Sequence, residues 1–155
     1  MQFRKAASRL ILVSLLAVTS LSPHFSERIR ADDVKTFNVS MVAQNLKVPV
    51  ALQFAPDGQI FVGEKYGTIQ VIHQDGTTSD FGSLAVNSDF EQGLLGLVID
   101  PNFVTNGYMY VAYTRPDGNF NRVSRITASA ANHQVMEAGS EKILLDDIPS
   151  PTGIH

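Results

Sequence analysis

Short apolar runs separated by turn residues dominate this chain after residue 33. Three of them predict consecutive β-strands, over Gly93–Ile99, Tyr108–Thr114 and Arg122–Thr127. The second and third runs are rich in aromatic and β-branched residues, which favour strands. Asn106-Gly107 and Pro116-Asp117-Gly118 separate the runs and are typical turn sequences. Three short strands joined by such turns predict an antiparallel meander.

The preceding part of the chain shows the same pattern. Pro49 lies in the first strand of this part and favours an edge or a bend, because proline has no N–H to donate. The sequence Ala55-Pro56-Asp57-Gly58 predicts a tight turn, since proline presets the first central φ and glycine accepts the left-handed conformation that follows. The four expected strands cover residues 48–54, 59–65, 68–73 and 79–84.

The two parts are related by an internal repeat. Leu52–Pro56 matches Leu97–Pro101, and Ile60–Val62 matches Met109–Val111. The copies lie 45 residues apart at the prolines and 49 at the aromatic residues, about the length of one four-stranded blade of a β-propeller. The pattern therefore predicts an all-β chain with two propeller blades of four antiparallel strands.

The remaining segments complete this prediction. Thr36–Ala43 alternates apolar and polar residues, which suits an N-terminal strand that closes a propeller ring. Glu141–Leu145 is the last expected strand, and residues 128–136 are predicted to form a loop. Because a closed propeller needs at least about four blades, the ring is incomplete, and we expect the chain to be the front portion of a longer protein.

The N-terminus predicts an exported protein. Basic residues precede the short apolar run Leu10–Val18, as in a secretory signal, so residues 1–31 are interpreted as signal peptide and linker and residues 34–155 as the folded domain. The alternatives are an uncleaved anchor or a buried first helix, although the run is shorter than the roughly 20 residues that a stable membrane span needs. A periplasmic or secreted location follows.

Charge and composition narrow the partners. The net charge of the 155 residues is −3, and the basic leader leaves the rest of the chain acidic, which argues against nucleic acid as a partner. The chain has no cysteine, so it has neither a disulfide framework nor a thiolate metal site.

The stretch Glu91–Arg125 contains GLLG, DPNF, YVAYT and RVSR in that order. It resembles the soluble pyrroloquinoline-quinone (PQQ) dependent sugar dehydrogenases of the glucose/sorbosone dehydrogenase family, which are six-bladed propellers. The resemblance implies part of an exported quinoprotein that oxidises the anomeric hydroxyl of an aldose, with hydride transfer to PQQ and a separate electron acceptor. That family also binds calcium. Its PQQ and calcium contacts come mostly from later blades, so this chain alone is expected to be inactive.

The resemblance also suggests site residues. The approach sequence LLDDIPSPTGIH places His155 where the family has its general base, a role that suits imidazole near neutral pH. The family's substrate-contacting glutamine corresponds to Glu91, and Gln92 follows it. The carboxylate of Glu91 can still accept hydrogen bonds from sugar hydroxyls. The alternative for Glu91 is a loop residue that satisfies turn amides.

Other polar clusters carry weaker signals. Asp100 and Asn102 hint at a calcium loop, but Val104 occupies the fifth ligand position, so turn capping is the better interpretation. Asp146 and Asp147 form a carboxylate pair, yet adjacent strand residues are expected to point to opposite faces. Two arginines of the third strand, Arg122 and Arg125, are expected to make structural pairs.

A non-catalytic alternative shares the same fold. Secreted propellers of the Hedgehog-interacting or lectin-like type bind partners without redox chemistry. The sequence that follows His155 in a longer protein would discriminate between the two, because a glycine-rich strand and later basic residues around a central pocket favour the enzyme.

We predict that the leader is removed on export. Mass spectrometry of the exported protein should give an N-terminus between about residues 19 and 33, because cleavage follows the apolar core. Recovery of intact Met1 from the exported fraction would contradict this prediction.

Overall fold

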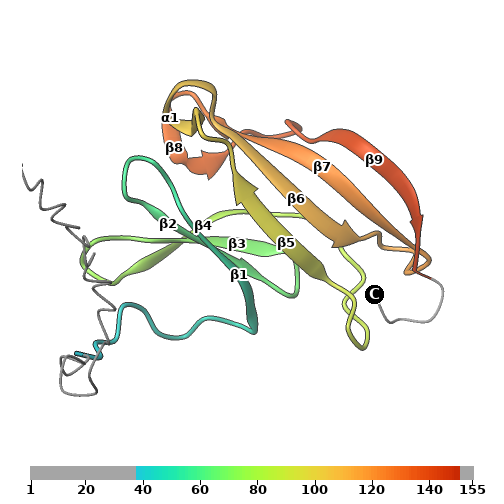
Figure 1. The fold of residues 1–155 in the computed structure, drawn as a ribbon, viewed down its shortest axis with the longest axis horizontal. Helices are drawn as coiled ribbons and strands as arrows, with labels where there is room; N and C mark the ends of the chain where they lie inside the picture. The colour runs from blue at the N-terminus through green and yellow to red at the C-terminus, as the bar shows by residue number, and fades with distance from the viewer. Residues whose placement is uncertain (1–37, 151–155) are drawn as a thin grey trace, which may run out of the picture. The chain divides into compact units, whose positions relative to one another are not determined.

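The computed structural model describes residues 38–150, and it is nearly all β-structure (Figure 1). The first sheet has four antiparallel strands in sequence order: β1 (Pro49–Phe54), β2 (Ile60–Glu64), β3 (Thr68–Ile72) and β4 (Thr78–Ser83). The second contains β5 (Leu94–Ile99), β6 (Tyr108–Thr114), β7 (Phe120–Ser129), β8 (Asn132–Met136) and β9 (Lys142–Pro149). A single turn of helix, α1 (Phe103–Asn106), joins β5 to β6. All of these elements belong to one compact unit that begins at Val39.

The two predicted blades are confirmed. In the first sheet each strand pairs with the next. In the second sheet β5 pairs with β6, β6 with β7, and β7 with both β8 and β9. The turn after β1 has the expected geometry: the Gly58 N–H donates to the Ala55 carbonyl at 2.9 Å, and Gly58 has a φ of 86°. Pro49 begins an edge strand, and the register between β1 and β2 shifts next to it.

The core lies between the two sheets. Alternate residues of β2, β3 and β4 face alternate residues of β5, β6 and β7, as the two-residue period of a strand requires. Phe103 of α1 is fully buried and lies edge-on to Phe61 with ring centroids 5.5 Å apart. Phe61 also packs against Phe81 at 5.4 Å. Other members from the first sheet are Ile69 and Val71, and from the second Leu97, Met109, Val111 and Ile126.

Two glycines allow the sheets to approach closely where β5 begins. A Cβ on Gly63 would lie 2.9 Å from Leu94 Cδ2, so the bare glycine makes room for the buried Leu94 side chain. A Cβ on Gly93 would lie 2.4 Å from the Lys65 carbonyl oxygen, which accepts the Leu94 N–H at 2.9 Å. Gly93 also has a φ of 149°, which L side chains rarely adopt. We call this pair of contacts the glycine junction.

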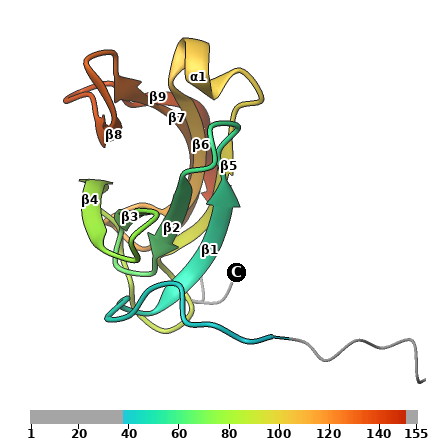
Figure 2. The same cartoon turned by 90° about the vertical axis from the view of Figure 1, so that its left-hand side faces the viewer.

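A second contact joins the sheets farther out. β8 lies beside β4 in Figure 2, and a Cβ on Gly82 would lie 2.7 Å from Met136 Cβ. β8 was not expected, since residues 128–136 were predicted to form a loop. It forms because β7 continues to Ser129, which leaves Ala128 and Ser129 to pair with Met136 and Asn132.

Two further expectations need correction. The strand predicted over Thr36–Ala43 is absent from the described residues 38–46, and Val39 is 95% exposed. A strand needs a neighbour for its backbone hydrogen bonds, and none of the described strands pairs with this segment. Helix α1 was missed because four residues are too few to display a helical period. Within residues 38–150, no helix has the length and hydropathy needed to cross a membrane.

The glycine junction predicts a contrast between two alanine substitutions. Gly93→Ala should lower the free energy of unfolding by about 2 kcal/mol or more, because the new methyl group meets the Lys65 carbonyl and the φ is strained. Gly96→Ala is the matched control, since its Cβ would meet only Ala112 Cβ at an ordinary 3.7 Å. Urea denaturation measures both variants, and equal losses would contradict the prediction.

Candidate functional site

Four connecting segments gather at one end of the two sheets, which we call the loop end. They are the β2–β3 turn, the β4–β5 loop, the β6–β7 turn and the residue that follows β9; Figure 1 shows the last three near one another. Backbone hydrogen bonds join them: Leu84 N–H donates to Gly67 O at 3.0 Å, Asn87 N–H to Thr114 O at 3.2 Å, and Ser150 N–H to Asn119 O at 2.8 Å. The antiparallel order of the strands therefore builds one surface from distant parts of the sequence.

Glu91 lies exposed on the β4–β5 loop. It borders an open recess of about 400 Å³, whose other lining residues are Val50, Lys65, Phe90, Leu94 and Leu95. The Lys65 Nζ donates to the Phe90 carbonyl at 2.5 Å, and the Lys65 carbonyl accepts the Leu94 N–H. The recess is thus lined by one carboxylate, one ammonium group and apolar side chains.

Gln92 points the other way. It is 3% exposed, and its Nε2 donates to the Gly118 carbonyl at 2.6 Å and lies 3.5 Å from the Ser150 carbonyl. The side chain therefore ties the β4–β5 loop to the β6–β7 turn and to the end of β9. This structural role was not foreseen from the sequence, and a role for Gln92 in binding substrate stays a prediction.

His155 lies outside the described residues. The chain can be followed to Ser150, which is buried at the loop end and held there by the Asn119 carbonyl. The assignment of His155 as a general base therefore stays a prediction. Glu91 and the end of β9 nevertheless belong to the same end of the sheets, as that assignment requires.

The expectation that Asp146 and Asp147 point apart was wrong. The pairing moves from Asn121–Ile148 to Val123–Leu145, so both aspartates stand opposite Arg122 in a β-bulge. Both carboxylates lie near one guanidinium: Arg115 Nη1 is 3.4 Å from Asp146 Oδ1 and 2.5 Å from Asp147 Oδ1. Both carboxylates are therefore ion-paired with Arg115.

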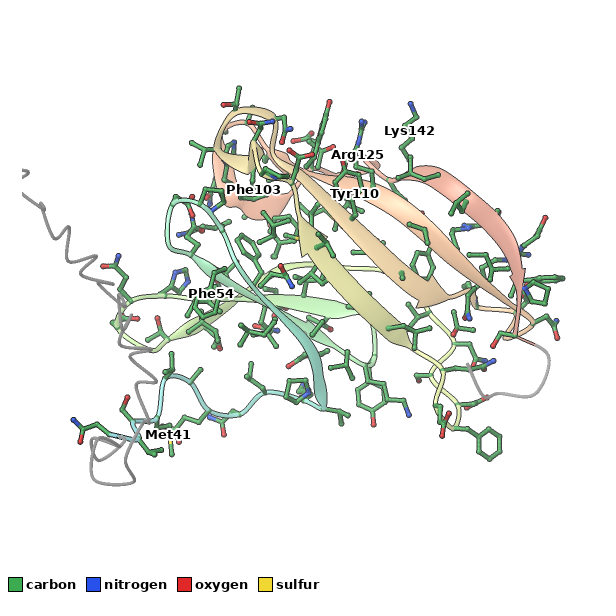
Figure 3. All side chains as sticks on the ribbon, viewed as in Figure 1. Met41, Phe54, Phe103, Tyr110, Arg125 and Lys142 are labelled. Atoms are coloured by element: carbon green, nitrogen blue, oxygen red, sulfur yellow. The ribbon has the colours of Figure 1, made fainter. Side chains whose placement is uncertain are left out.

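The structural role expected for the arginines is confirmed. Arg122 holds Asp146 through two hydrogen bonds, Nε to Oδ1 at 3.1 Å and Nη2 to Oδ2 at 2.7 Å. These bonds lower the pKa of Asp146 to about 2. The Arg125 guanidinium lies 3.9 Å from the centroid of the Tyr108 ring, and Figure 3 shows Arg125 beside Tyr110 on the same sheet.

Asp100 caps a turn, as expected. Its Oδ1 accepts the Asn102 N–H at 2.9 Å and the Asn106 Nδ2 at 3.0 Å, and its Oδ2 accepts the Tyr110 hydroxyl at 2.9 Å. These hydrogen bonds, the Asn102 N–H first, lower the pKa of Asp100.

A second recess of about 480 Å³ lies at the opposite end, around the β1–β2 and β3–β4 turns. It includes Asp57, Gln59 and His73, none of which the sequence analysis linked to chemistry. The histidine Nε2 pairs with the Ser79 hydroxyl at 2.9 Å. The volume alone gives no reason to place the reaction there, whereas the predicted residue Glu91 lies at the loop end.

Comparison with known proteins identifies the family. The model of the glucose/sorbosone dehydrogenase family matches residues 46–155. The chain belongs to this family. Quinoprotein glucose dehydrogenase B of Acinetobacter calcoaceticus is 27% identical over 114 residues, which cover 70% of this chain and 23% of that protein. The human Hedgehog-interacting protein is also 27% identical, over 128 residues that cover 71% of this chain and 18% of that protein.

Solved structures described as sugar dehydrogenases share the fold. An oxidoreductase from Thermus thermophilus, described as a glucose dehydrogenase, superposes with a TM-score of 0.64 at 31% identity. The match covers 74% of this chain and 33% of that one. The PQQ-bound aldose sugar dehydrogenase of Streptomyces coelicolor has a TM-score of 0.63 at 23% identity, over 72% of this chain and 34% of that one. This glucose/sorbosone dehydrogenase chain thus spans about a third or less of the relatives it matches, and its two sheets are two blades of a propeller.

The described residues do not by themselves fit PQQ or calcium, the cofactors that the sequence resemblance implies. PQQ carries three carboxylates, but the Arg115 and Arg122 guanidinium groups are already paired with aspartates. Lys65 is the remaining cation described at the recess, and one of its N–H groups is bonded to Phe90 O. No group of three or more His, Asp or Glu side chains in residues 38–150 is placed to hold a metal ion. The quinone and calcium of a complete enzyme would need ligands from elsewhere.

The Arg122–Asp146 pair predicts a pH dependence of stability. Because the folded pKa of Asp146 is depressed, the pair stabilises the fold above the ordinary pKa of about 4, and this contribution is lost as the pH falls toward 2. Asp146→Asn should therefore lower Tm at neutral pH, and its Tm should fall less than that of the wild type between pH 4 and 2. Glu137→Gln, an exposed carboxylate outside the arginine cluster, is the control. Parallel Tm profiles for wild type and Asp146→Asn would contradict the prediction.

Proposed function

We propose that this chain supplies the first two blades of an exported sugar dehydrogenase that oxidises the anomeric hydroxyl of an aldose. In the complete protein PQQ would act as the oxidant, and a separate acceptor would reoxidise it. Family membership supports the sugar dehydrogenase class, and the basic, apolar leader in residues 1–31 supports export to the periplasm or beyond.

The observation that carries this proposal is the position of Glu91. Its exposed carboxylate lies beside an open recess at the loop end, where Ser150 after β9 also lies. A carboxylate accepts strong hydrogen bonds from sugar hydroxyls, so Glu91 can orient a monosaccharide. In the sequence His155 follows Ser150 by five residues, and we assign it as the proton acceptor for the same sugar.

The reaction divides between two groups. His155 would take the proton of the anomeric hydroxyl as that hydroxyl is oxidised. A quinone held by other parts of the complete protein would supply the two-electron oxidant. This chain contributes the proton acceptor and the sugar contact. Groups that hold the quinone and calcium belong to other blades, so the 155-residue chain alone is expected to oxidise no sugar even with both supplied.

The match to the Hedgehog-interacting protein is the reason to test one alternative, a propeller that binds a partner without catalysis. A binding propeller would need neither the Glu91 carboxylate nor the His155 imidazole. The alternative therefore predicts no sugar oxidation by the complete protein under any supply of quinone and calcium.

Dye-linked sugar oxidation by the complete protein that carries this chain tests the proposal. His155→Ala should lower kcat by about 10²–10⁴-fold, the usual contribution of a general base, and leave quinone binding largely intact. Glu91→Gln should raise KM several-fold, because a neutral amide accepts weaker hydrogen bonds than a carboxylate.

The control for this assay is Glu137→Gln, which lies outside the loop end and should leave both constants unchanged. An active protein that tolerates the His155 change would overturn the assignment of the base. A quinone-loaded complete protein without sugar oxidation would favour the binding propeller.

A further inference from the structure

Phe90, next to Glu91, is the most unusual residue of the loop end. Its side chain is 85% exposed although phenylalanine is among the residues most often buried, and its φ is 49°. A positive φ is a genuine outlier for a bulky residue and strains the backbone. Such strain persists only where the surrounding structure holds it in place.

The surroundings of Phe90 hold its backbone on both sides. Its carbonyl accepts a hydrogen bond from the Lys65 Nζ. A second hydrogen bond spans Phe90, from the Gln92 N–H to the Asp89 carbonyl at 2.8 Å. The glycine junction then fixes Gly93 and Leu94 against Lys65. The loop therefore presents the Phe90 ring outward from a fixed backbone.

We propose that Phe90 is a stacking platform for the sugar ring, beside the carboxylate of Glu91. This inference rests on the proposed function, because it assigns a further specificity-determining residue to the same sugar site. Axial C–H bonds give a pyranose an apolar, slightly electropositive face, which matches the negative face of an aromatic ring. The hydroxyls at the edge of the sugar ring remain free to donate to Glu91.

The size and lining of the recess fit this occupant. About 400 Å³ lies within the range of small-molecule sites, roughly 300–1,000 Å³. Its lining combines the apolar residues Val50, Leu94 and Leu95 with Lys65 and Glu91. Lys65 has three N–H donors, of which one is used by Phe90 O, so it can also donate to a sugar oxygen. An open recess with an aromatic ring and two opposite charges suits a neutral polyhydroxylated ring better than an anion or a lipid chain.

Saturation-transfer NMR on the complete protein that carries this chain, without quinone, tests the platform without any redox chemistry. The probe is methyl β-D-glucopyranoside, whose axial H1, H3 and H5 form one flat face, and sorbitol serves as an open-chain comparison without such a face. We expect saturation transfer to the axial protons of the glucoside, at least fivefold weaker transfer in Phe90→Ala, and retained transfer in Phe90→Tyr. Sorbitol should show little transfer to any variant.

Phe54→Ala is the matched control, because Phe54 is 68% exposed and lies at the far end of β1 from the recess (Figure 3). It should leave transfer unchanged, and circular dichroism should show that all variants keep the β-fold. Absence of transfer to the wild-type protein, or equal transfer to wild type and Phe90→Ala, overturns the platform. The proposed function is judged separately by oxidation in the complete protein, so a failed platform with intact activity identifies the inference alone as wrong.

Discussion

The close approach of the two blades at the glycine junction is the constraint on which the rest of the structure depends. Gly63 has no side chain where Leu94 is buried, and Gly93 has none where the Lys65 carbonyl lies. At each position the missing side chain leaves room for a group of the other blade. Because interiors are close-packed, one added methyl group at either place would have to move backbone or a fully buried side chain. The core between the sheets, with Phe61 and Phe103 at its centre, depends on that spacing.

The same contacts connect the fold to the candidate site. Lys65 accepts the Leu94 N–H with its carbonyl and holds Phe90 with its amine, so one residue of the first blade shapes the loop that carries Glu91. Gln92 then ties that loop to the end of β9. The recess is thus built by residues whose packing also determines how the blades meet, which places the sugar site we propose on a rigid support.

The blades could be predicted from the sequence because turns and two-residue periodicity are local signals. Most strands, the turn at Gly58 and the capping role of Asp100 follow from such signals. What could not be predicted depends on distant contacts: the pairing of β8 with the end of β7, the bulge that turns Asp147 toward Arg115, and the inward orientation of Gln92. The GLLG motif indicated the family. Its first glycine, Gly93, is needed because the Lys65 carbonyl lies against it, and no sequence pattern connects these two residues 28 positions apart.

We propose that the complete protein binds its sugar at the loop end, which the glycine junction holds in place. A crystal structure of the complete protein with bound quinone and a soaked aldose tests it most directly. If the loop end binds the sugar, a sugar hydroxyl should lie within about 3 Å of a Glu91 carboxylate oxygen, which is hydrogen-bond distance. A sugar bound at the opposite end, around the β1–β2 turn, or a Glu91 that faces bulk solvent away from the bound sugar, would contradict it.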